Sequence, residues 1–182
     1  MRFASTLSVL AAIALAGCAH KPAQPAAADD GGGRVKSAVA TLSPAANGGV
    51  AGIVTFAGGG DQVDVHVVAT GLQPGSIHGF HVHETGNCAS PDPMSAGGHF
   101  NPTRKPHGPQ AGEHHAGDMP GLLADPSGRI DSTFALKGVT LGGAEGFVGH
   151  AVILHAGPDD YATQPTGNSG GRLACGVIAA NP

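Results

Sequence analysis

Histidine is the residue type in this chain with the clearest capacity for chemistry. The 182 residues include 11 histidines, and most of these lie between His78 and His115. Neutral imidazole is a common nitrogen ligand for zinc and copper in proteins. An excess of histidine that is concentrated in one part of the chain therefore indicates a metal site.

Two of these histidines share the short run Phe80-His81-Val82-His83. In a β-strand, residues i and i+2 point to the same face, so His81 and His83 project together, opposite Phe80 and Val82. Two nitrogens on one rigid element make a good start to a copper site. His155 ends the apolar run 152–154, and a strand there would bring it to the end of the sheet.

A second set consists of His99, His107 and His115, spaced eight residues apart, followed by Asp118. Three imidazoles and one carboxylate satisfy a tetrahedral zinc ion. Metal binding would also supply the folding free energy that a loop with few large apolar side chains lacks. For each histidine taken singly the alternative is a solvated surface side chain, and His114 competes with His115 as a ligand.

The elements that must position these side chains are predicted to be β-strands. The chain contains 31 glycines and 14 prolines, which interrupt helical periodicity. Residues 62–70 alternate apolar and polar side chains, which places His66 on a solvent face. We expect an all-β sandwich or barrel with two long functional loops, 85–126 and 156–172. The predicted strands are 38–42, 50–56, 63–70, 77–84, 130–136, 151–155 and 176–179.

The start of the chain has the pattern of an export signal. Arg2 precedes an apolar run over residues 7–16 that is too short to span a bilayer, so residues 1–17 predict a signal peptide. Residues 15–18 (Leu-Ala-Gly-Cys) resemble a bacterial lipobox, which implies a lipid on Cys18. The alternatives are an ordinary signal peptide with a chance cysteine and a buried N-terminal helix.

The next segment, residues 18–33, is built from small and polar residues and predicts a flexible tether. Ala19 rather than aspartate follows Cys18, and by resemblance to lipoprotein sorting rules this implies the outer membrane. The expected organisation is therefore a lipoprotein signal peptide over 1–17, a lipid-anchored tether over 18–33 and one domain over 34–182, located in the periplasm.

The composition of the chain restricts the classes of molecule that it can bind. The formal net charge is −4, there is no tryptophan and only one tyrosine, and the chain has no basic run. These features argue against nucleic acid as a partner. With Cys18 assigned to the lipid, Cys88 and Cys175 remain as an even pair, for which a bridge is favoured in an exported protein over two free buried thiols.

Three segments together resemble a known family. Residues 79–84 (Gly-Phe-His-Val-His-Glu) resemble the copper-ligand signature of the copper/zinc superoxide dismutases. Residues 99–102 (His-Phe-Asn-Pro) are similar to their bridging-histidine motif, and residues 167–178 are similar to their C-terminal signature. The resemblance covers about residues 37–179. It implies an Ig-like, Greek-key β-sandwich or flattened barrel with long metal-binding and channel loops.

The resemblance also implies the ligands and the roles of individual residues. It implies one copper and one zinc per subunit, with His99 shared between them and the pattern His-x-x-Asp favouring His115 over His114. Asp159 would link His81 to His107, Cys88 and Cys175 would form the disulfide, and Arg172 would act with His99 in catalysis. The copper ligands would be His81, His83, His99 and His155, and the zinc ligands His99, His107, His115 and Asp118.

The implied reaction converts superoxide into O₂ and H₂O₂ by alternating reduction and oxidation of the copper. The alternative is a periplasmic copper- and zinc-binding protein without dismutase activity. The monomer and the homodimer both stay open. Two segments depart from the family pattern. Residues 91–94 form an insertion relative to eukaryotic members, and residues 156–171 lack the Glu and Lys side chains that steer superoxide in many relatives, which leaves Arg172 as the main steering charge.

Overall fold

The computed structural model describes residues 35–46, 48–59 and 61–181. Within these ranges the chain forms β-strands and one short 3-10 helix, with no α-helix. The prediction of an all-β fold is confirmed. The elements are β1 (Ser37–Pro44), β2 (Ala51–Gly59), β3 (Gln62–Thr70), β4 (Ile77–His78), β5 (Phe80–His83), η1 (Met94–Ala96), β6 (Leu122–Leu123), β7 (Ile130–Lys137), β8 (Ala151–His155), β9 (Arg172–Val177) and β10 (Ala179–Ala180).

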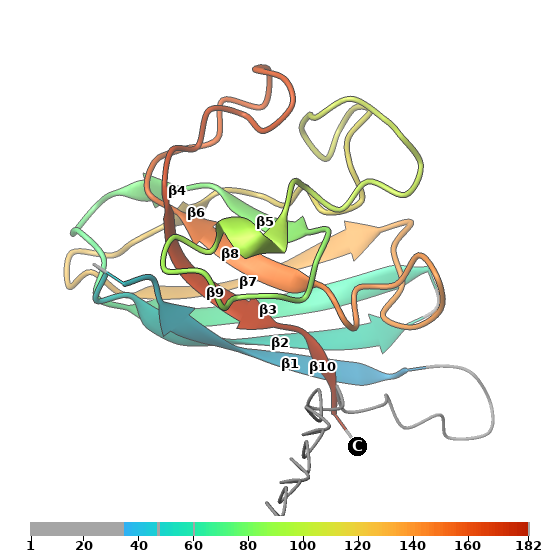
Figure 1. Ribbon diagram of the computed structural model, residues 1–182, viewed down its shortest axis with the longest axis horizontal. Helices are drawn as coiled ribbons and strands as arrows, with labels where there is room; N and C mark the ends of the chain where they lie inside the picture. The colour runs from blue at the N-terminus through green and yellow to red at the C-terminus, as the bar shows by residue number, and fades with distance from the viewer. Residues whose placement is uncertain (1–34, 47, 60, 182) are drawn as a thin grey trace, which may run out of the picture.

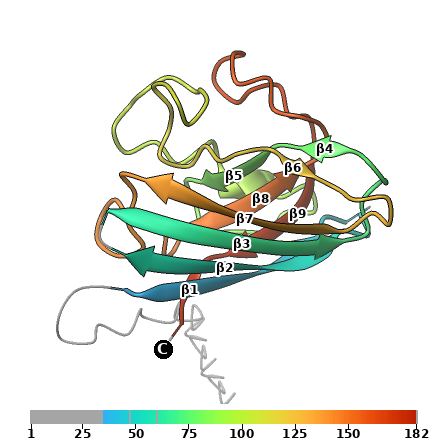
Figure 2. The same ribbon diagram turned by 180° about the vertical axis from the view of Figure 1, so that it is seen from behind.

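The main sheet has the strand order β5-β8-β9-β1-β2-β3-β7 and curls into two layers (Figures 1 and 2). Strand β1 joins the layers, because residues 37–42 pair with β2 whereas Ser43 and Pro44 pair with β9. The pairs β3–β7 and β9–β1 are neighbours that do not follow each other in the chain. Such crossovers produce the Greek-key connection expected for a β-sandwich.

The core lies between the two layers. The inward side chains of β3, from Val63 to Ala69, are buried and alternate with exposed ones such as His66, as the alternation in the sequence predicts. The opposite layer differs, because every residue of β5 and β8 is buried. The aromatic part of the core includes Phe56 and Phe147, whose rings pack edge to face with centroids 6.3 Å apart.

The strand predicted over residues 77–84 is wrong as a single element. The chain breaks at Gly79, so that β4 pairs with β6 and β5 pairs with β8. A side chain at Gly79 would collide with Ser169, and the Gly79 N–H donates to the carbonyl of Gly157 over 2.8 Å. The backbone therefore approaches another loop closely here, at a position where glycine is needed.

The strand predicted over residues 176–179 is also wrong in its bounds. Strand β9 begins at Arg172, which is paired with His155 of β8, and β10 forms separately at residues 179–180. Pairing with β8 extends the strand back to Arg172 and brings Ala174 and Cys175 into the buried layer. The short strand β6 lies inside the segment that the sequence predicts as a loop.

Two long segments project from the same side of the sandwich, the segment after β5 and the segment between β8 and β9 (Figure 1). A disulfide joins Cys88 of the first to Cys175 of β9, with Cα atoms 5.7 Å apart, so this predicted pairing is confirmed. None of the described residues forms a helix long and apolar enough to cross a bilayer. The predicted signal peptide, Cys18 and the tether lie outside the described residues.

Candidate metal centre

Two groups of buried side chains converge at the base of the projecting segments, and they share His99. We call them the four-histidine cluster and the three-histidine–aspartate cluster. Within each cluster the candidate ligand atoms all lie within 4.8 Å of one another. The structure thus brings together every predicted metal ligand. The first cluster is His81, His83, His99 and His155, and the second is His99, His107, His115 and Asp118.

Strand pairing positions the four-histidine cluster. His81 and His83 alternate with core residues of β5, and β8 runs antiparallel beside it and ends at His155. An isolated bridge between His83 and His99 brings the loop residue onto the same edge. The Nε2 atoms of His83 and His155 are 3.3 Å apart, and the rings of His81 and His99 have centroids 4.0 Å apart.

The second cluster gathers around one carboxylate oxygen. Asp118 Oδ1 lies 2.8 Å from His99 Nδ1, 3.0 Å from His107 Nδ1 and 3.3 Å from His115 Nδ1. A tetrahedral ion with bonds of about 2.0 Å separates its ligand atoms by about 3.3 Å. The spacing and the donor types therefore fit a zinc-type site.

Several ring nitrogens in the clusters have no hydrogen-bond partner. His81 Nδ1, His99 Nε2 and His107 Nδ1 are fully buried and unpaired. A buried polar atom left without a partner costs about 1–3 kcal/mol. His107 Nδ1 lies 3.0 Å from Asp118 Oδ1 yet lacks hydrogen-bond geometry, which is the arrangement of two ligands facing a common ion. Buried ring nitrogens without a hydrogen-bond partner, facing other donor atoms, are what metal ligands require, so the residues of both clusters fit bound metal ions.

The opposite ring nitrogens are held by hydrogen bonds. Asp159 accepts from His81 Nε2 at 2.6 Å and from His107 Nε2 at 2.9 Å, through separate carboxylate oxygens. His83 Nδ1 donates to the carbonyl of Gly97 at 3.0 Å. Partners of this kind fix the tautomer and the orientation of a ligating ring. The predicted contact of Asp159 with both histidines is present in the structure.

Burial dominates the electrostatics of the four-histidine cluster. It lowers the pKa of His81 to about 4, of His83 to about 2 and of His155 to about 3. These imidazoles are neutral at pH 7, which is the form that binds a metal.

In the second cluster the pKa of one histidine is raised and the pKa values of another histidine and of Asp118 are lowered. Burial lowers the pKa of His115. It also acts to lower that of His107, but the Asp159 hydrogen bond and the Asp118 charge outweigh burial and raise this pKa. Burial acts to raise the pKa of Asp118, yet hydrogen bonds from His99 and from the N–H groups of His115 and Gly108 hold it well below its usual range. Asp118 is therefore an anionic ligand at every physiological pH.

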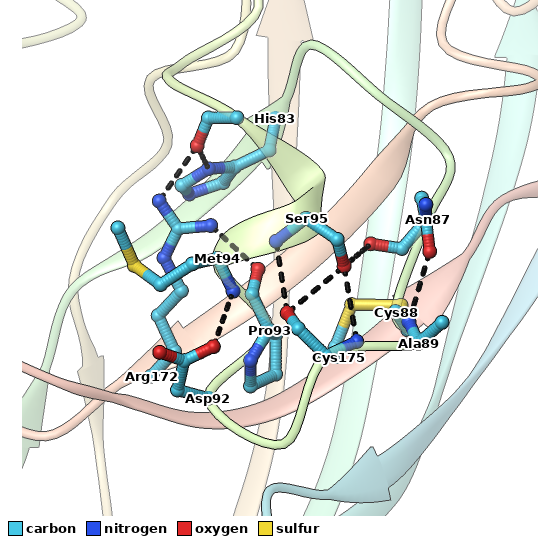
Figure 3. Close-up of a disulfide and its surroundings, with 12 residues drawn as sticks. His83, Asn87, Cys88, Ala89, Asp92, Pro93, Met94, Ser95, Arg172 and Cys175 are labelled. Atoms are coloured by element: carbon cyan, nitrogen blue, oxygen red, sulfur yellow. Dashed lines mark hydrogen bonds between the residues drawn. A yellow bond between two sulfur atoms is a disulfide. The ribbon is translucent and has the colours of Figure 1, made fainter.

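Arg172 belongs to neither cluster but lies beside the first one. Its guanidinium donates to the carbonyls of Pro93 at 2.7 Å and Gly97 at 2.6 Å (Figure 3). Gly97 is the residue whose carbonyl also accepts from His83. One backbone carbonyl thus fixes both a candidate ligand and the predicted catalytic arginine.

The remaining described histidines lie outside both clusters. His66 is exposed on the outer face of β3 and contacts Asp131 at 2.9 Å. His78 is buried and bonded to the His155 carbonyl, and His150 stacks on Phe100 with ring centroids 4.0 Å apart. His114 is half-buried and lies outside the cluster, whereas its neighbour His115 is buried within it.

Further supporting contacts carry no signal in the sequence. The Gln164 side chain binds both the N–H and the carbonyl of His107, over 2.9 Å each. Tyr161 donates its N–H to Asp159 and accepts the N–H of Gly121 on its hydroxyl, both at 2.7 Å. Gly167 has a φ of 67°, and a Cβ there would collide with Asp159 and His107. Only glycine allows the loop to close over these two side chains.

A β-sandwich with a shared histidine between two buried clusters defines a class of paired-metal proteins, and comparison with known proteins identifies the family. The profile of the copper/zinc superoxide dismutases matches residues 50–178. Because this match spans most of the sequence, the chain belongs to the copper/zinc superoxide dismutase family.

Individual relatives agree with this assignment. The chain is 42% identical over 130 residues to the superoxide dismutase-like protein YojM of Bacillus subtilis, a match covering 66% of this chain and 65% of that protein. It is 43% identical over 122 residues to a copper/zinc superoxide dismutase of Aquifex aeolicus, covering 63% of this chain and 71% of the relative. Among solved structures, the clock protein EA4 matches with a TM-score of 0.72 and 36% identity, over 80% of this chain and 95% of EA4.

Proposed function

We propose that this protein is a superoxide dismutase that holds copper in the four-histidine cluster and zinc in the three-histidine–aspartate cluster. The observation that carries the proposal is His99, which faces one cluster with Nε2 and the other with Nδ1 while its ring is buried. A single imidazole shared by two metals couples a redox ion to a structural one. Copper, when bound, supplies a reversible one-electron exchange with superoxide, which zinc does not.

The protein residues supply the proton chemistry and the orientation. His99 can take up a proton on Nε2 while Nδ1 stays within the second cluster. It can return that proton to the reduced substrate, and water supplies the second proton that H₂O₂ needs. Asp159 fixes the orientation of the His81 ring in the first cluster and of the His107 ring in the second, through one hydrogen bond to each. Burial keeps the imidazoles of His81, His83 and His155 neutral and excludes bulk water from the four-histidine cluster.

Arg172 binds the substrate in this proposal. Superoxide is a small anion, and a guanidinium fixed beside the four-histidine cluster attracts and orients it by charge and hydrogen bonds. The two hydrogen bonds to Pro93 and Gly97 use two of the five N–H donors of the side chain. The others are available to an anion.

The competing candidate is a copper- and zinc-binding protein without dismutase activity. It is supported by the name of the Bacillus relative, which is called only superoxide dismutase-like. Both readings predict metal binding, but only the enzyme requires Arg172. The complete set of ligands together with Arg172 favours the enzyme.

The test is superoxide decay by pulse radiolysis on copper- and zinc-loaded protein, for wild type, Arg172→Ala, Arg172→Lys and Arg172→Glu. We expect both metals to stay bound in all four. Dismutation should fall about 10- to 100-fold in the Ala variant, recover in part in the Lys variant and fall further in the Glu variant. Loaded wild type that does not dismute superoxide would leave the metal-binding protein as the answer, and equal rates across the series would remove Arg172 from the mechanism.

We also propose that the mature protein is a periplasmic lipoprotein with its lipid on Cys18, anchored at the outer membrane. The support is the lipobox-like sequence at residues 15–18 and the tether after it. Mass spectrometry of the exported protein should find an acylated N-terminal Cys18. An unmodified N-terminus downstream of Cys18 would overturn the anchor without affecting the proposed reaction.

A further inference from the structure

The segment from Ser90 to Gly97 holds Arg172 in place. The carbonyls of Pro93 and Gly97, on either side of η1, accept the two guanidinium hydrogen bonds (Figure 3). The segment is itself closed by hydrogen bonds between Ser90 and Ser95 and is tied to β9 through the nearby disulfide of Cys88. Arg172 therefore has a fixed position relative to this segment.

The same segment carries a negative charge beside the arginine. Asp92 immediately precedes Pro93, and its carboxylate is fixed by the N–H of Met94, which donates to Oδ1 at 3.1 Å. Figure 3 draws Asp92 and Arg172 on the same side of η1. No ion pair within 4 Å joins the two among the described residues, so they interact through space.

The charges of these two groups act on each other. The Met94 hydrogen bond is the main cause that holds the pKa of Asp92 below its usual value, and Arg172 contributes to that lowering. Burial lowers the pKa of Arg172, and the Asp92 carboxylate opposes this effect. Arg172 in turn contributes to the lowered pKa of His83 and of His155. The hydrogen bonds place Arg172 between His83 and Asp92, because it shares the Gly97 carbonyl with His83 and binds the Pro93 carbonyl next to Asp92.

Neither segment that flanks the arginine carries another positive charge. Asp92 is the only charged side chain between residues 85 and 98, and the segment 156–171 contributes no lysine or arginine. The carboxylates near Arg172 are Glu84, whose Oε2 accepts the N–H of Gly98 at 3.1 Å, and Asp92, which lies in the segment that holds the guanidinium. Asp92 directly precedes Pro93, whose carbonyl accepts one of the two guanidinium hydrogen bonds.

We propose that Asp92 is an electrostatic modulator of the site, whose carboxylate reduces the affinity and the encounter rate of small anions at the four-histidine cluster. The inference rests on the proposed function for the identity of the substrate, because superoxide is the anion affected. The field of Asp92 acts on any small anion, so the effect is measurable without dismutation.

The central variant is Asp92→Asn. It removes the charge but keeps an Oδ1 acceptor for the Met94 N–H, so the fold of the segment is retained. We expect azide to bind copper- and zinc-loaded Asp92→Asn about two- to threefold more tightly than wild type at low ionic strength, as for loss of one unit charge within about 10 Å in a solvent-exposed setting. The superoxide rate constant should rise by the same factor, and Asp92→Lys should extend both changes.

Optical titration with azide at two ionic strengths provides the readout, alongside pulse radiolysis. At about 0.5 M salt the variants should converge on wild type, because the screening length falls to a few ångströms. The matched control is Asp61→Asn, which makes the same charge change in the turn between β2 and β3 and should leave azide affinity unchanged.

Azide affinity that is unchanged or lower in both Asp92 variants would overturn the proposal. So would an increase that persists at high salt, since that would mark a change of shape rather than of charge. A rise in azide affinity in a protein that does not dismute superoxide would support the role of Asp92 and sink the proposed reaction, so the two failures are distinguishable.

Discussion

Most imidazoles of the two clusters are used at both ring nitrogens, one facing the other candidate ligands and one held by the protein. Asp159 holds His81 and His107, and the Gly97 carbonyl holds His83. Because the tautomer is set from outside, the inward nitrogen is left as a bare lone pair. This explains why His81 Nδ1 and His107 Nδ1 are buried without a hydrogen-bond partner.

Replacing Asp159 by alanine therefore tests how far one carboxylate supports both sites. Asp159→Ala leaves two buried N–H groups without acceptors and frees both rings, so we expect about 10- to 100-fold weaker zinc binding and weaker copper binding as well. Competition with a chelator measures both affinities. Asp160→Ala is the matched control, because Asp160 binds the Thr163 turn and no histidine. Loss confined to one metal would show that Asp159 does not couple the sites.

At the scale of elements, the segment around the second cluster is held mainly by polar contacts. His107 and His115 are buried in it, whereas the residues between them are mostly exposed. A bound ion that joins these side chains to His99 and Asp118 would supply the folding free energy that apolar packing does not.

The neighbours His114 and His115 give a matched pair for this idea. His115→Ala should weaken zinc binding and make residues 101–118 sensitive to limited proteolysis, because a buried ligand of the second cluster is lost. His114→Ala should change neither property, since that side chain lies outside the cluster and bonds to the Gly112 carbonyl. If His114→Ala releases zinc and His115→Ala does not, our assignment of the ligand is reversed.

The elements also show what can be predicted from the sequence. Alternation in residues 62–70 is enough to predict a half-buried strand, and the spacing of His81 and His83 places both on one face, because side-chain periodicity depends only on local backbone geometry. The full ligand sets, with His99 in both and His115 in place of His114, follow only from the resemblance to the family. The break at Gly79 was missed, because it depends on the approach of Ser169 from a distant loop. The role of the Gly97 carbonyl was missed as well, since every residue has a carbonyl and only the fold selects one.

At the scale of the whole molecule, the clusters impose a cost on the fold before any metal binds. Four buried histidines have lowered pKa values, His81, His83, His115 and His155, and one, His107, has a raised value. The disulfide between Cys88 and Cys175 opposes this cost, since closing a loop of 87 residues stabilises a fold by about 4–5 kcal/mol in the chain-entropy estimate.

The sign of the pH dependence of the metal-free protein follows from these shifts. Below pH 6.5, the ordinary histidine value, the unfolded chain takes up protons at His81, His83 and His155, while the folded protein does not until about pH 4 or lower. Stability therefore falls as pH drops through this window, by about 1 kcal/mol per pH unit for each such histidine. The raised pKa of His107 stabilises the folded protein instead. This stabilisation is fully present below pH 6.5 and is lost only at higher pH, so it does not change within the window. Asp118 and Asp159 have lowered pKa values, and the stability that these two carboxylates contribute is lost only below this pH window.

We therefore expect the urea midpoint of the metal-free, disulfide-bonded protein to fall steeply between pH 6.5 and pH 5. The slope should correspond to an uptake of about 2–3 protons on unfolding, because His81, His83 and His155 dominate this pH window. His155→Gln removes one of these groups and should reduce the uptake by about one proton. A midpoint that stays constant across this range would show that the buried imidazoles already carry protons in the folded protein, and a pH slope of His155→Gln equal to that of wild type would locate the titrating groups elsewhere.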